Sequence, residues 1–311
     1  MVQTQRIRGI LAPVVTPFKK DLSPDPNRLI AHCRWLLTQN CGLAVFGTNS
    51  EANSLSLDER LELLDALLEV GIDPTRMMPG TGCCSLSETV RLTSKAVESG
   101  CAGVLMLPPF YYKGVSEDGL YNYFSEVIER VGDSRLRIYL YHIPPVAIVG
   151  ITPGLVERLI KKYPTAIAGM KDSSGQWENT KIMLNNFATS GFDVFTGNES
   201  FLLANMKNAG VGCISATANV NPAAIDRLFR EWNNPDAETQ QQNLDAVRNT
   251  VGQFMMIASL KAVVAHFTND PAWTTVRPPL TKLSAEQANT VISGLKQLDF
   301  KMPGIISAER K

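Results

Sequence analysis

Lys171 is the residue whose position in the sequence most clearly indicates chemistry. It ends the apolar run Ile167–Lys171, which has the composition of a strand buried on both faces. Burial there disfavours the charged form of an amine, and a neutral amine can attack a ketone to form an electron-withdrawing imine. The alternative is a structural lysine that pairs with Asp172 or extends to solvent. Taken alone, this run favours the structural alternative.

Tyr141 supports the catalytic interpretation of Lys171. It ends the preceding apolar run, Arg137–Tyr141, so the two side chains would lie at the ends of neighbouring strands. A phenol in that position can move protons between the amine and a substrate oxygen. The alternative is an aromatic residue at the rim with a hydrogen-bonded hydroxyl.

The stretch Gly47–Glu51 (GTNSE) has the composition of an anion-binding loop. Gly47 lets the backbone approach a ligand, and Thr48 and Asn49 offer donors beside backbone N–H groups, which suits a carboxylate. A turn followed by a helix cap would have the same composition. The pair Tyr111-Tyr112 is by itself more typical of a core or an interface.

These residues follow a regular alternation of elements. Eight short apolar runs, each followed by a helical pattern, predict an α/β fold of parallel strands, and eight such units predict a (β/α)₈ TIM barrel. A doubly wound sheet would usually carry a glycine-rich turn after the first strand, where this chain has Val15-Thr16-Pro17-Phe18. The expected strands are Ile7–Phe18, Gly42–Phe46, Met77–Gly82, Ala102–Leu107, Arg137–Tyr141, Ile167–Lys171, Asp193–Phe195 and Val211–Ser215.

The helices complete this prediction. Ser87 and Thr152 are expected N-caps. Beyond the last strand the pattern is helical only, with one long or broken helix over Gln240–Phe267 and another over Ser284–Leu298. We therefore expect a catalytic barrel over residues 1–233 and a C-terminal helical appendix over 234–311 packed on it, since no flexible linker precedes it. The expected barrel helices are Asn27–Gln39, Asp58–Val70, Ser87–Glu98, Asp118–Arg130, Pro153–Lys161, Glu178–Phe187, Ser200–Asn208 and Pro222–Asn233.

A barrel brings the carboxyl ends of its strands to one face, where such enzymes have their active sites. Polar residues follow most of the predicted strands, and we expect them to converge on one cavity. They are Thr16, Gly47–Glu51, Tyr111, Tyr112, Tyr141, Lys171, Gly197–Glu199 and Ser215–Asn219.

Composition excludes several classes of function. The 30 basic and 30 acidic residues balance and form no basic run, which argues against a nucleic-acid or membrane-surface partner. The sequence contains no apolar stretch of about 18 residues, the length that a membrane-spanning helix needs. The first residues lack the pattern of a signal peptide, so we expect a cytoplasmic protein. The six cysteines form no Cys-x-x-Cys pair and the three histidines are far apart, so no metal site is expected.

Five motifs, in chain order, resemble the dihydrodipicolinate synthase/N-acetylneuraminate lyase family of Schiff-base-forming, pyruvate-dependent class I aldolases. The resemblance covers about Gly9 to Asn233. The motifs are Gly47–Glu51, Pro109–Tyr112 leading into Gly119–Tyr121, Tyr141–Pro144, Gly169–Asp172 and Gly212–Asn219.

The resemblance implies a role for each matched residue. Lys171 is similar to the imine-forming lysine and Tyr141 to the proton-relaying tyrosine. Thr48 and Asn49 lie where the family binds the carboxylate of pyruvate; the resemblance implies a catalytic role for Thr48 and a substrate-binding role for Gly47. Tyr112 matches a tyrosine that enters the neighbouring subunit's site, which implies a homotetramer built as a dimer of dimers. The covalent imine on Lys171 would need no cofactor. Further substrate contacts are implied for Ser173, Glu199 and Ile214.

Two departures from the family pattern bear on the reaction. Val146 stands where the synthase has an arginine for the carboxylate of its aldehyde substrate, and an apolar residue cannot make that bidentate contact. Asn49-Ser50 replaces the usual hydroxyl residue and glycine. We expect a lyase of 2-oxo acids, either a pyruvate-releasing aldolase or a 2-keto-3-deoxy sugar acid dehydratase. The alternatives are dihydrodipicolinate synthase with another residue replacing the arginine, and a non-catalytic keto-acid-binding barrel.

Overall fold

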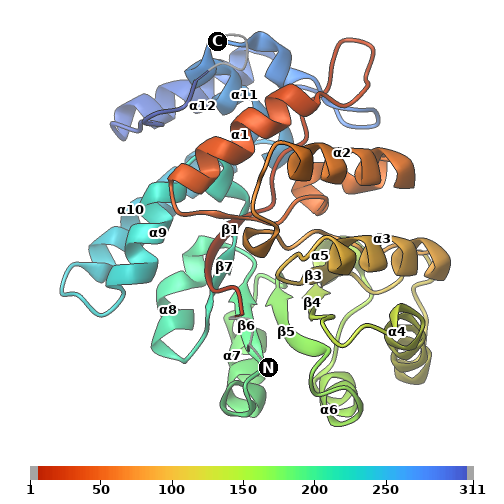
Figure 1. Ribbon diagram of the computed structural model, residues 1–311. Coiled ribbons are helices and arrows are strands. Elements are labelled where there is room, and N and C mark those ends of the chain that lie inside the picture. Colours follow the sequence, from red (N-terminus) through yellow and green to blue (C-terminus); the bar gives the residue numbers. More distant parts are fainter. Residues whose placement is uncertain (1–5, 307–311) are drawn as a thin grey trace. The chain divides into compact units, whose positions relative to one another are not determined.

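The computed structural model describes residues 6–306, in which helices alternate with parallel strands (Figure 1). This confirms the predicted α/β class. The chain divides into two compact units. The first contains residues up to Gly9 together with Asp73–Ile214, and the second contains Ile10–Ile72 together with the chain from Ser215 onward.

Five parallel strands form the sheet of the first unit. Each strand pairs with the next along the chain, as expected for strands joined by helical crossovers. The strands are β3 (Val104–Met106), β4 (Ile138–His142), β5 (Ile167–Asp172), β6 (Asp193–Thr196) and β7 (Gly212–Ile214).

The prediction of a strand over Met77–Gly82 is wrong. The segment makes a single parallel bridge, between Gly80 and Leu105 of β3. The Leu105 amide donates to Pro79 O at 2.8 Å, and the Thr81 amide donates to Leu105 O at 3.0 Å. The segment thus runs beside β3, but Pro79 has no N–H to donate and Gly80 has no side chain to pack, and both residues weaken a strand.

Helices cover one face of this sheet. The N-cap of α3 is Ser85, whose side chain accepts from the Glu88 amide, so the expected cap at Ser87 is wrong. Thr152 caps α6 as predicted. The helices of the unit are α3 (Leu86–Glu98), α4 (Glu117–Val131), α5 (Pro144–Ala147), α6 (Pro153–Lys162), α7 (Trp177–Phe187) and α8 (Leu202–Lys207).

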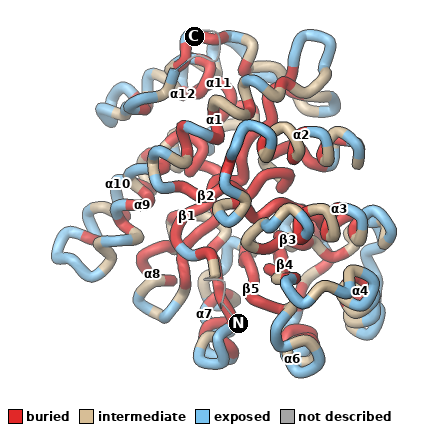
Figure 2. Tube along the Cα trace, viewed as in Figure 1, coloured by how far each residue is buried: buried red, intermediate tan, exposed pale blue. Residues whose placement is uncertain are grey.

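Successive side chains of β4, β5 and β6 point to opposite faces of the sheet, and one of these faces packs against the helices. Ile138, Leu140 and Met170 belong to one core cluster with buried residues of α3, α4, α6 and α7. Their neighbours in the sequence, Tyr141 and Lys171 among them, therefore point to the opposite face. Both faces are buried, as the red tube along these strands shows in Figure 2.

The second unit combines two strands with mostly helical segments. Strands β1 (Gly9–Ala12) and β2 (Gly42–Leu43) pair in parallel, with Leu11 opposite Gly42. The predicted helix over Gln240–Phe267 is broken near Gly252 into α10 and α11, which are bent by 100°. The remaining helices start and end close to their predicted bounds. The helices are α1 (Pro26–Thr38), α2 (Leu57–Glu69), α9 (Pro222–Glu231), α10 (Ala237–Val251), α11 (Met256–Thr268) and α12 (Ala285–Gln297).

The C-terminal helices belong to the same compact unit as residues 10–72. A catalytic domain that ends at residue 233 therefore stays a prediction. Over residues 6–306 no single helix is long and apolar enough to cross a membrane, and α10 with α11 meets that criterion only as a bent pair.

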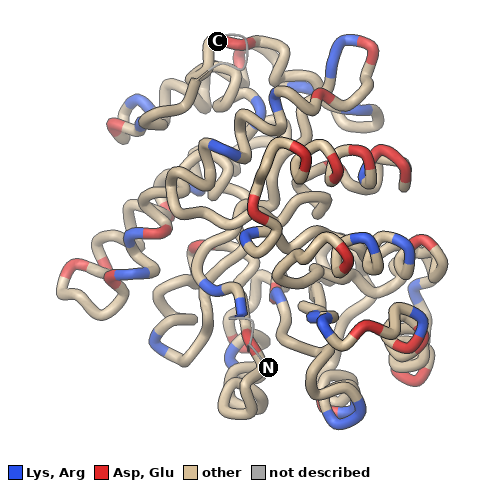
Figure 3. The backbone as a smooth tube through the Cα atoms, in the orientation of Figure 1, with Lys and Arg blue, Asp and Glu red and all other residues tan. Residues whose placement is uncertain are grey.

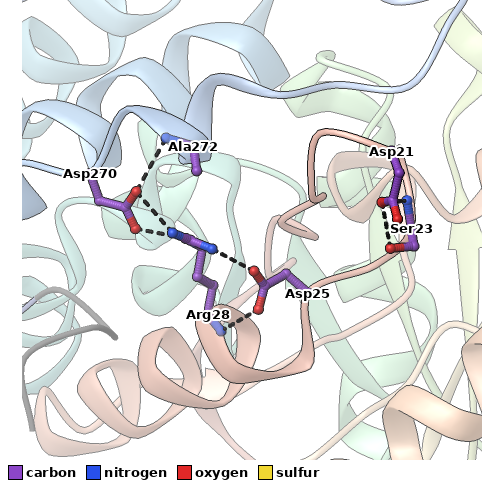
Figure 4. A network of polar contacts seen from close by, with 6 residues as sticks. All are labelled: Asp21, Ser23, Asp25, Arg28, Asp270 and Ala272. Atoms are coloured by element: carbon purple, nitrogen blue, oxygen red, sulfur yellow. Dashed lines mark hydrogen bonds and ion pairs between the residues drawn. The ribbon is translucent and has the colours of Figure 1, made fainter.

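Charged residues of both signs occur along helices such as α3 and α10 (Figure 3). In the second unit, Arg28 lies between two buried carboxylates, as Figure 4 shows. Its Nη1 lies 2.5 Å from Asp25 Oδ2, and its Nε lies 2.6 Å from Asp270 Oδ2. Asp25 is also the N-cap of α1, so one carboxylate both starts the helix and pairs with its first turn.

His32, on α1, should make the protein less stable in mild acid. Its side chain is buried against Trp35 and Trp273, and this burial lowers its pKa from 6.5 to about 4. Between these values the unfolded chain binds a proton that the folded chain does not, so stability falls as pH falls through this range. We expect a loss of about 2 kcal/mol between pH 7 and pH 5 from this group.

Urea unfolding at pH 7 and pH 5 measures this effect. Glutamine at position 32 cannot gain a charge. The loss in free energy of unfolding from pH 7 to pH 5 should therefore be about 2 kcal/mol smaller in His32→Gln than in the wild type. Equal changes in the two proteins would show that His32 does not cause the acid sensitivity.

Candidate active site

Lys171 and Tyr141 lie together on the face of the sheet opposite the helices. They are register partners on neighbouring strands β5 and β4. Lys171 Nζ donates to Tyr141 Oη at 3.2 Å and lies 4.2 Å from the centre of the tyrosine ring. The two residues are only 2% and 3% exposed. A buried amine thus lies in direct contact with a phenolic hydroxyl, the pair that the sequence predicted.

Lys171 neither pairs with Asp172 nor extends to solvent, the two structural alternatives to a catalytic role. The side chain is buried, so it does not extend to solvent. Asp172 points to the other face, where its carboxylate accepts from Asn179 Nδ2 at 2.9 Å and from Thr180 Oγ1 at 2.7 Å. Successive residues of a strand alternate between faces, which keeps this carboxylate away from the amine.

A glycine two residues before Lys171 creates room on the same face. A Cβ at Gly169 would lie 2.2 Å from Asp193 O and 2.9 Å from the ring of Tyr139. Without that Cβ, Tyr139 fills the space and packs edge-on against Phe195. Phe195 is also the register partner of Lys171 on β6. Aromatic residues are therefore the register partners of Lys171 on both neighbouring strands.

Ser173 follows directly after β5. Its amide donates to His142 O at 2.7 Å, which extends the pairing of β4 and β5 beyond the strands. Its hydroxyl Oγ is buried and has no hydrogen-bond partner among the described residues. A Cβ at Gly197 would lie 2.0 Å from this hydroxyl, so only glycine fits beside it. An unsatisfied buried hydroxyl is the kind of group that a polar ligand would satisfy.

Two further candidates are buried at the ends of β6 and β7. Glu199 begins a short 3₁₀ segment, Glu199–Phe201, and is buried. Ile214 is the last residue of β7 and is fully buried. The contacts of these two residues with a substrate stay predictions.

His142 lies on the helix side of β4, away from the amine. Its Nδ1 accepts from the Ile151 amide at 2.9 Å, so the histidine anchors the segment after α5. Burial lowers the pKa of His142 below its ordinary value, against the smaller opposing effect of Asp172. The histidine is therefore a neutral structural group at physiological pH.

Tyr112 and Val146 are exposed in the single chain. Tyr112 is 71% exposed, and its ring makes an edge-on contact with Tyr111 at 5.3 Å. Tyr112 is therefore not part of the buried site formed by Lys171 and Tyr141. Its expected role in a neighbouring subunit stays a prediction. Val146 lies on α5 and is largely exposed.

The Gly47–Glu51 loop belongs to the second unit and forms a tight turn. Residues Thr48–Ser50 make one 3₁₀ turn. The Gly47 amide donates to Ser50 Oγ at 3.1 Å, and Thr16 Oγ1 donates to Ser50 O at 2.7 Å. Thr48 and Asn49 are partly exposed, whereas Ser50 is buried. The turn thus leaves accessible the two residues predicted to bind a carboxylate.

Sequence reasoning missed Lys261. This lysine lies in the apolar stretch Ala258–Ala265 of α11 and is completely buried, with its amine paired to Glu51. A single charge inside an otherwise apolar helical run is the signal that could have found it, because such a charge needs a buried partner. Over residues 6–306, no group of three or more His, Cys, Asp or Glu side chains could hold a metal ion.

Known proteins resemble this chain over most of its length. The sequence model of the dihydrodipicolinate synthetase family matches residues 6–298. A DapA-like lyase from Chloroflexus aurantiacus, itself uncharacterized, is 31% identical over 90% of this chain and 93% of its own. The crystal structure of dihydrodipicolinate synthase from Agrobacterium tumefaciens has a TM-score of 0.87 and 30% identity, covering 94% of this chain and 99% of that one. The prophage protein YagE from E. coli K12, of the same family and solved in complex with pyruvate, has a TM-score of 0.85 and 26% identity, covering 95% and 99%.

Proposed function

Because the chain belongs to the dihydrodipicolinate synthetase family and is a lyase of the class I aldolase type, we propose that it forms a Schiff base with 2-oxo acids. The contact between Lys171 Nζ and Tyr141 Oη carries this proposal. A binding protein needs neither a buried amine nor a proton relay, which disfavours the non-catalytic barrel.

The chemistry follows from these two groups. The lone pair of Lys171 Nζ forms a bond to the C2 ketone carbon, and the ketone oxygen leaves as water after protonation, with Tyr141 carrying the protons. The resulting iminium accepts the electron pair of the breaking bond. If the C3–C4 bond breaks, the C4 hydroxyl loses its proton, an aldehyde leaves, and protonation and hydrolysis release pyruvate. If instead C3 loses a proton and the C4 hydroxyl takes a proton and leaves as water, hydrolysis of the resulting unsaturated imine frees Lys171 and releases a dehydrated keto acid.

The remaining roles rest on the family resemblance. We propose that Gly47, Thr48 and Asn49 bind the carboxylate, and that Ser173, Glu199 and Ile214 contact the rest of the substrate. The buried, unpaired hydroxyl of Ser173 supports a substrate with hydroxyl groups. Val146 supports a sugar-acid lyase over the synthase, because it offers no charge to a second carboxylate.

We also propose the overall fold and assembly that the sequence resemblance implies. It comprises a closed (β/α)₈ barrel with a C-terminal helical appendix, and a homotetramer in which Tyr112 enters a neighbouring site. Molar mass in solution tests the tetramer. The cytoplasmic location stays a prediction.

Covalent trapping tests the Schiff base. Pyruvate together with borohydride should inactivate the enzyme irreversibly, because hydride reduces the iminium to a stable secondary amine on Lys171. Peptide mass mapping should find the adduct at this lysine, whereas borohydride alone should leave the activity intact. Active protein that carries no adduct at Lys171 would contradict the proposed function.

A panel of 2-oxo acids separates the possible reactions. Each compound is assayed in parallel for pyruvate release and for dehydration, and aspartate semialdehyde with pyruvate is included to test the synthase. We expect turnover of a 2-keto-3-deoxy sugar acid and little turnover of the semialdehyde. Robust synthase turnover would overturn the interpretation of Val146.

A further inference from the structure

An ion pair between Glu51 and Lys261 is buried in the second unit, at the end of the Gly47–Ser50 turn. The side chains of Glu51 and Lys261 are both completely inaccessible, and Lys261 Nζ donates to Glu51 Oε1. The same amine donates to Thr275 O at 2.8 Å and lies 4.5 Å from the centre of the Phe18 ring. The lysine is thus fixed by polar partners and packed against an aromatic face.

Glu51 connects this pair to the turn. It directly follows the 3₁₀ turn and has φ 55° and ψ 33°, a left-handed conformation that is unfavourable for residues other than glycine. Its amide donates to Thr48 O at 3.1 Å, and its second carboxylate oxygen accepts from the Arg277 amide at 3.0 Å. Donors on two other segments therefore hold the glutamate in a conformation that its own backbone disfavours.

Stability alone does not explain a charged pair at this place. Buried ion pairs are often no more stabilising than well-packed apolar residues, because each charge loses its hydration. An apolar pair would not fix the direction of residue 51, whereas a carboxylate with two defined donors does. The pair thus supplies orientation, which is what a ligand-binding turn requires.

We propose that the buried Glu51–Lys261 pair positions the Gly47–Ser50 turn and so sets the affinity of the enzyme for the carboxylate of its 2-oxo acid substrate. Glu51 and Lys261 are positioning residues, since they act through Thr48 and Asn49. The inference rests on the proposed function, in which these two residues bind the carboxylate.

Trapping of Lys171 with two ligands tests the role of the pair. Pyruvate carries the carboxylate, whereas pyruvamide has the same ketone without the charge. In Glu51→Gln, one of the two acceptor oxygens becomes a donor group. We expect the half-saturating pyruvate concentration for borohydride-dependent adduct formation to rise by about tenfold or more, and that for pyruvamide to change less than about threefold.

Asp270→Asn is the matched control. It weakens another buried ion pair of the same unit, and the carboxylate of Asp270 accepts from Arg28 and Ala272 rather than from the turn (Figure 4). Both ligands should trap this variant as they trap the wild type. An equal rise for both ligands in Glu51→Gln, or an unchanged value for pyruvate, would overturn the inference. A wild type that forms no adduct would instead overturn the proposed function itself, before any variant is made.

The wild-type enzyme provides a test that does not depend on a folded variant. Burial lowers the pKa of Lys261 to about 8, although Glu51 opposes this shift; Arg277 makes a smaller contribution in the same direction as burial. Glu59 pairs with Arg277 and keeps it charged. The ratio of half-saturating pyruvate to half-saturating pyruvamide should therefore rise by about threefold or more between pH 7 and pH 9, as Lys261 loses its proton. A constant ratio would contradict the positioning role.

Discussion

Replacing Lys171 by arginine should abolish covalent trapping by pyruvate and lower turnover of the best 2-oxo acid by about 10⁴-fold or more. Arginine keeps a positive charge but is never deprotonated in proteins, so it cannot attack the ketone. The loss is expected in kcat, because no other described residue takes the place of a buried amine beside Tyr141. Activity assays together with mass mapping of the borohydride-treated protein measure it.

Lys181→Arg is the matched control for this prediction. Lys181 lies on α7 of the same unit and is exposed, so the same change should leave trapping and turnover unaltered. Thermal unfolding of Lys171→Met adds a second measurement. Removing a buried amine should not lower stability, since apolar replacements of buried charges are often neutral or stabilising. Turnover retained in Lys171→Arg would exclude imine catalysis at this residue.

Replacing Tyr141 by phenylalanine should lower kcat by about 10²–10⁴-fold and change KM by less than about threefold. The ring that packs over the amine at 4.2 Å is kept, whereas the hydroxyl that contacts Nζ at 3.2 Å is lost. Proton transfer is thus removed and the shape of the site retained. Steady-state kinetics with the best substrate separate the two constants.

The neighbouring tyrosine on the same face of β4 provides the comparison. The hydroxyl of Tyr139 donates to Asp193 Oδ2 at 3.3 Å, whereas that of Tyr141 contacts the amine, so Tyr139→Phe should keep most of the kcat. If both variants lost kcat equally, the effect would come from general disturbance of the sheet. If Tyr141→Phe raised KM and kept kcat, the hydroxyl would bind substrate rather than carry protons.

The strands around the amine could be predicted because their sequence signal is local. Buried parallel strands are short apolar runs, and Lys171 interrupts the apolar pattern at the end of one of them. Strand order follows from the alternation of strands and helices, so the contact of Lys171 with Tyr141 could be expected before the structure was known. The sequence signal for the N-cap at Thr152 is equally local, because Pro153 directly follows it.

Other features depend on contacts distant in sequence and could not be predicted. Lys261 lies 210 positions from Glu51, and nothing near either residue identifies the other as its partner. The segment Met77–Gly82 has a strand-like composition, but Pro79 reduces it to one bridge beside β3. The shift of the α3 cap from Ser87 to Ser85 involves two serines with equal local signals.

If Ser173 contacts the substrate as proposed, its close approach to Gly197 limits how the substrate preference could change. Any side chain at position 197 would strike both the hydroxyl and the Cα of Ser173. Position 197 therefore tolerates only glycine, and it can offer a ligand only its backbone. Under the proposed function, a change of substrate would then have to arise at other proposed contacts, such as positions 173 and 199.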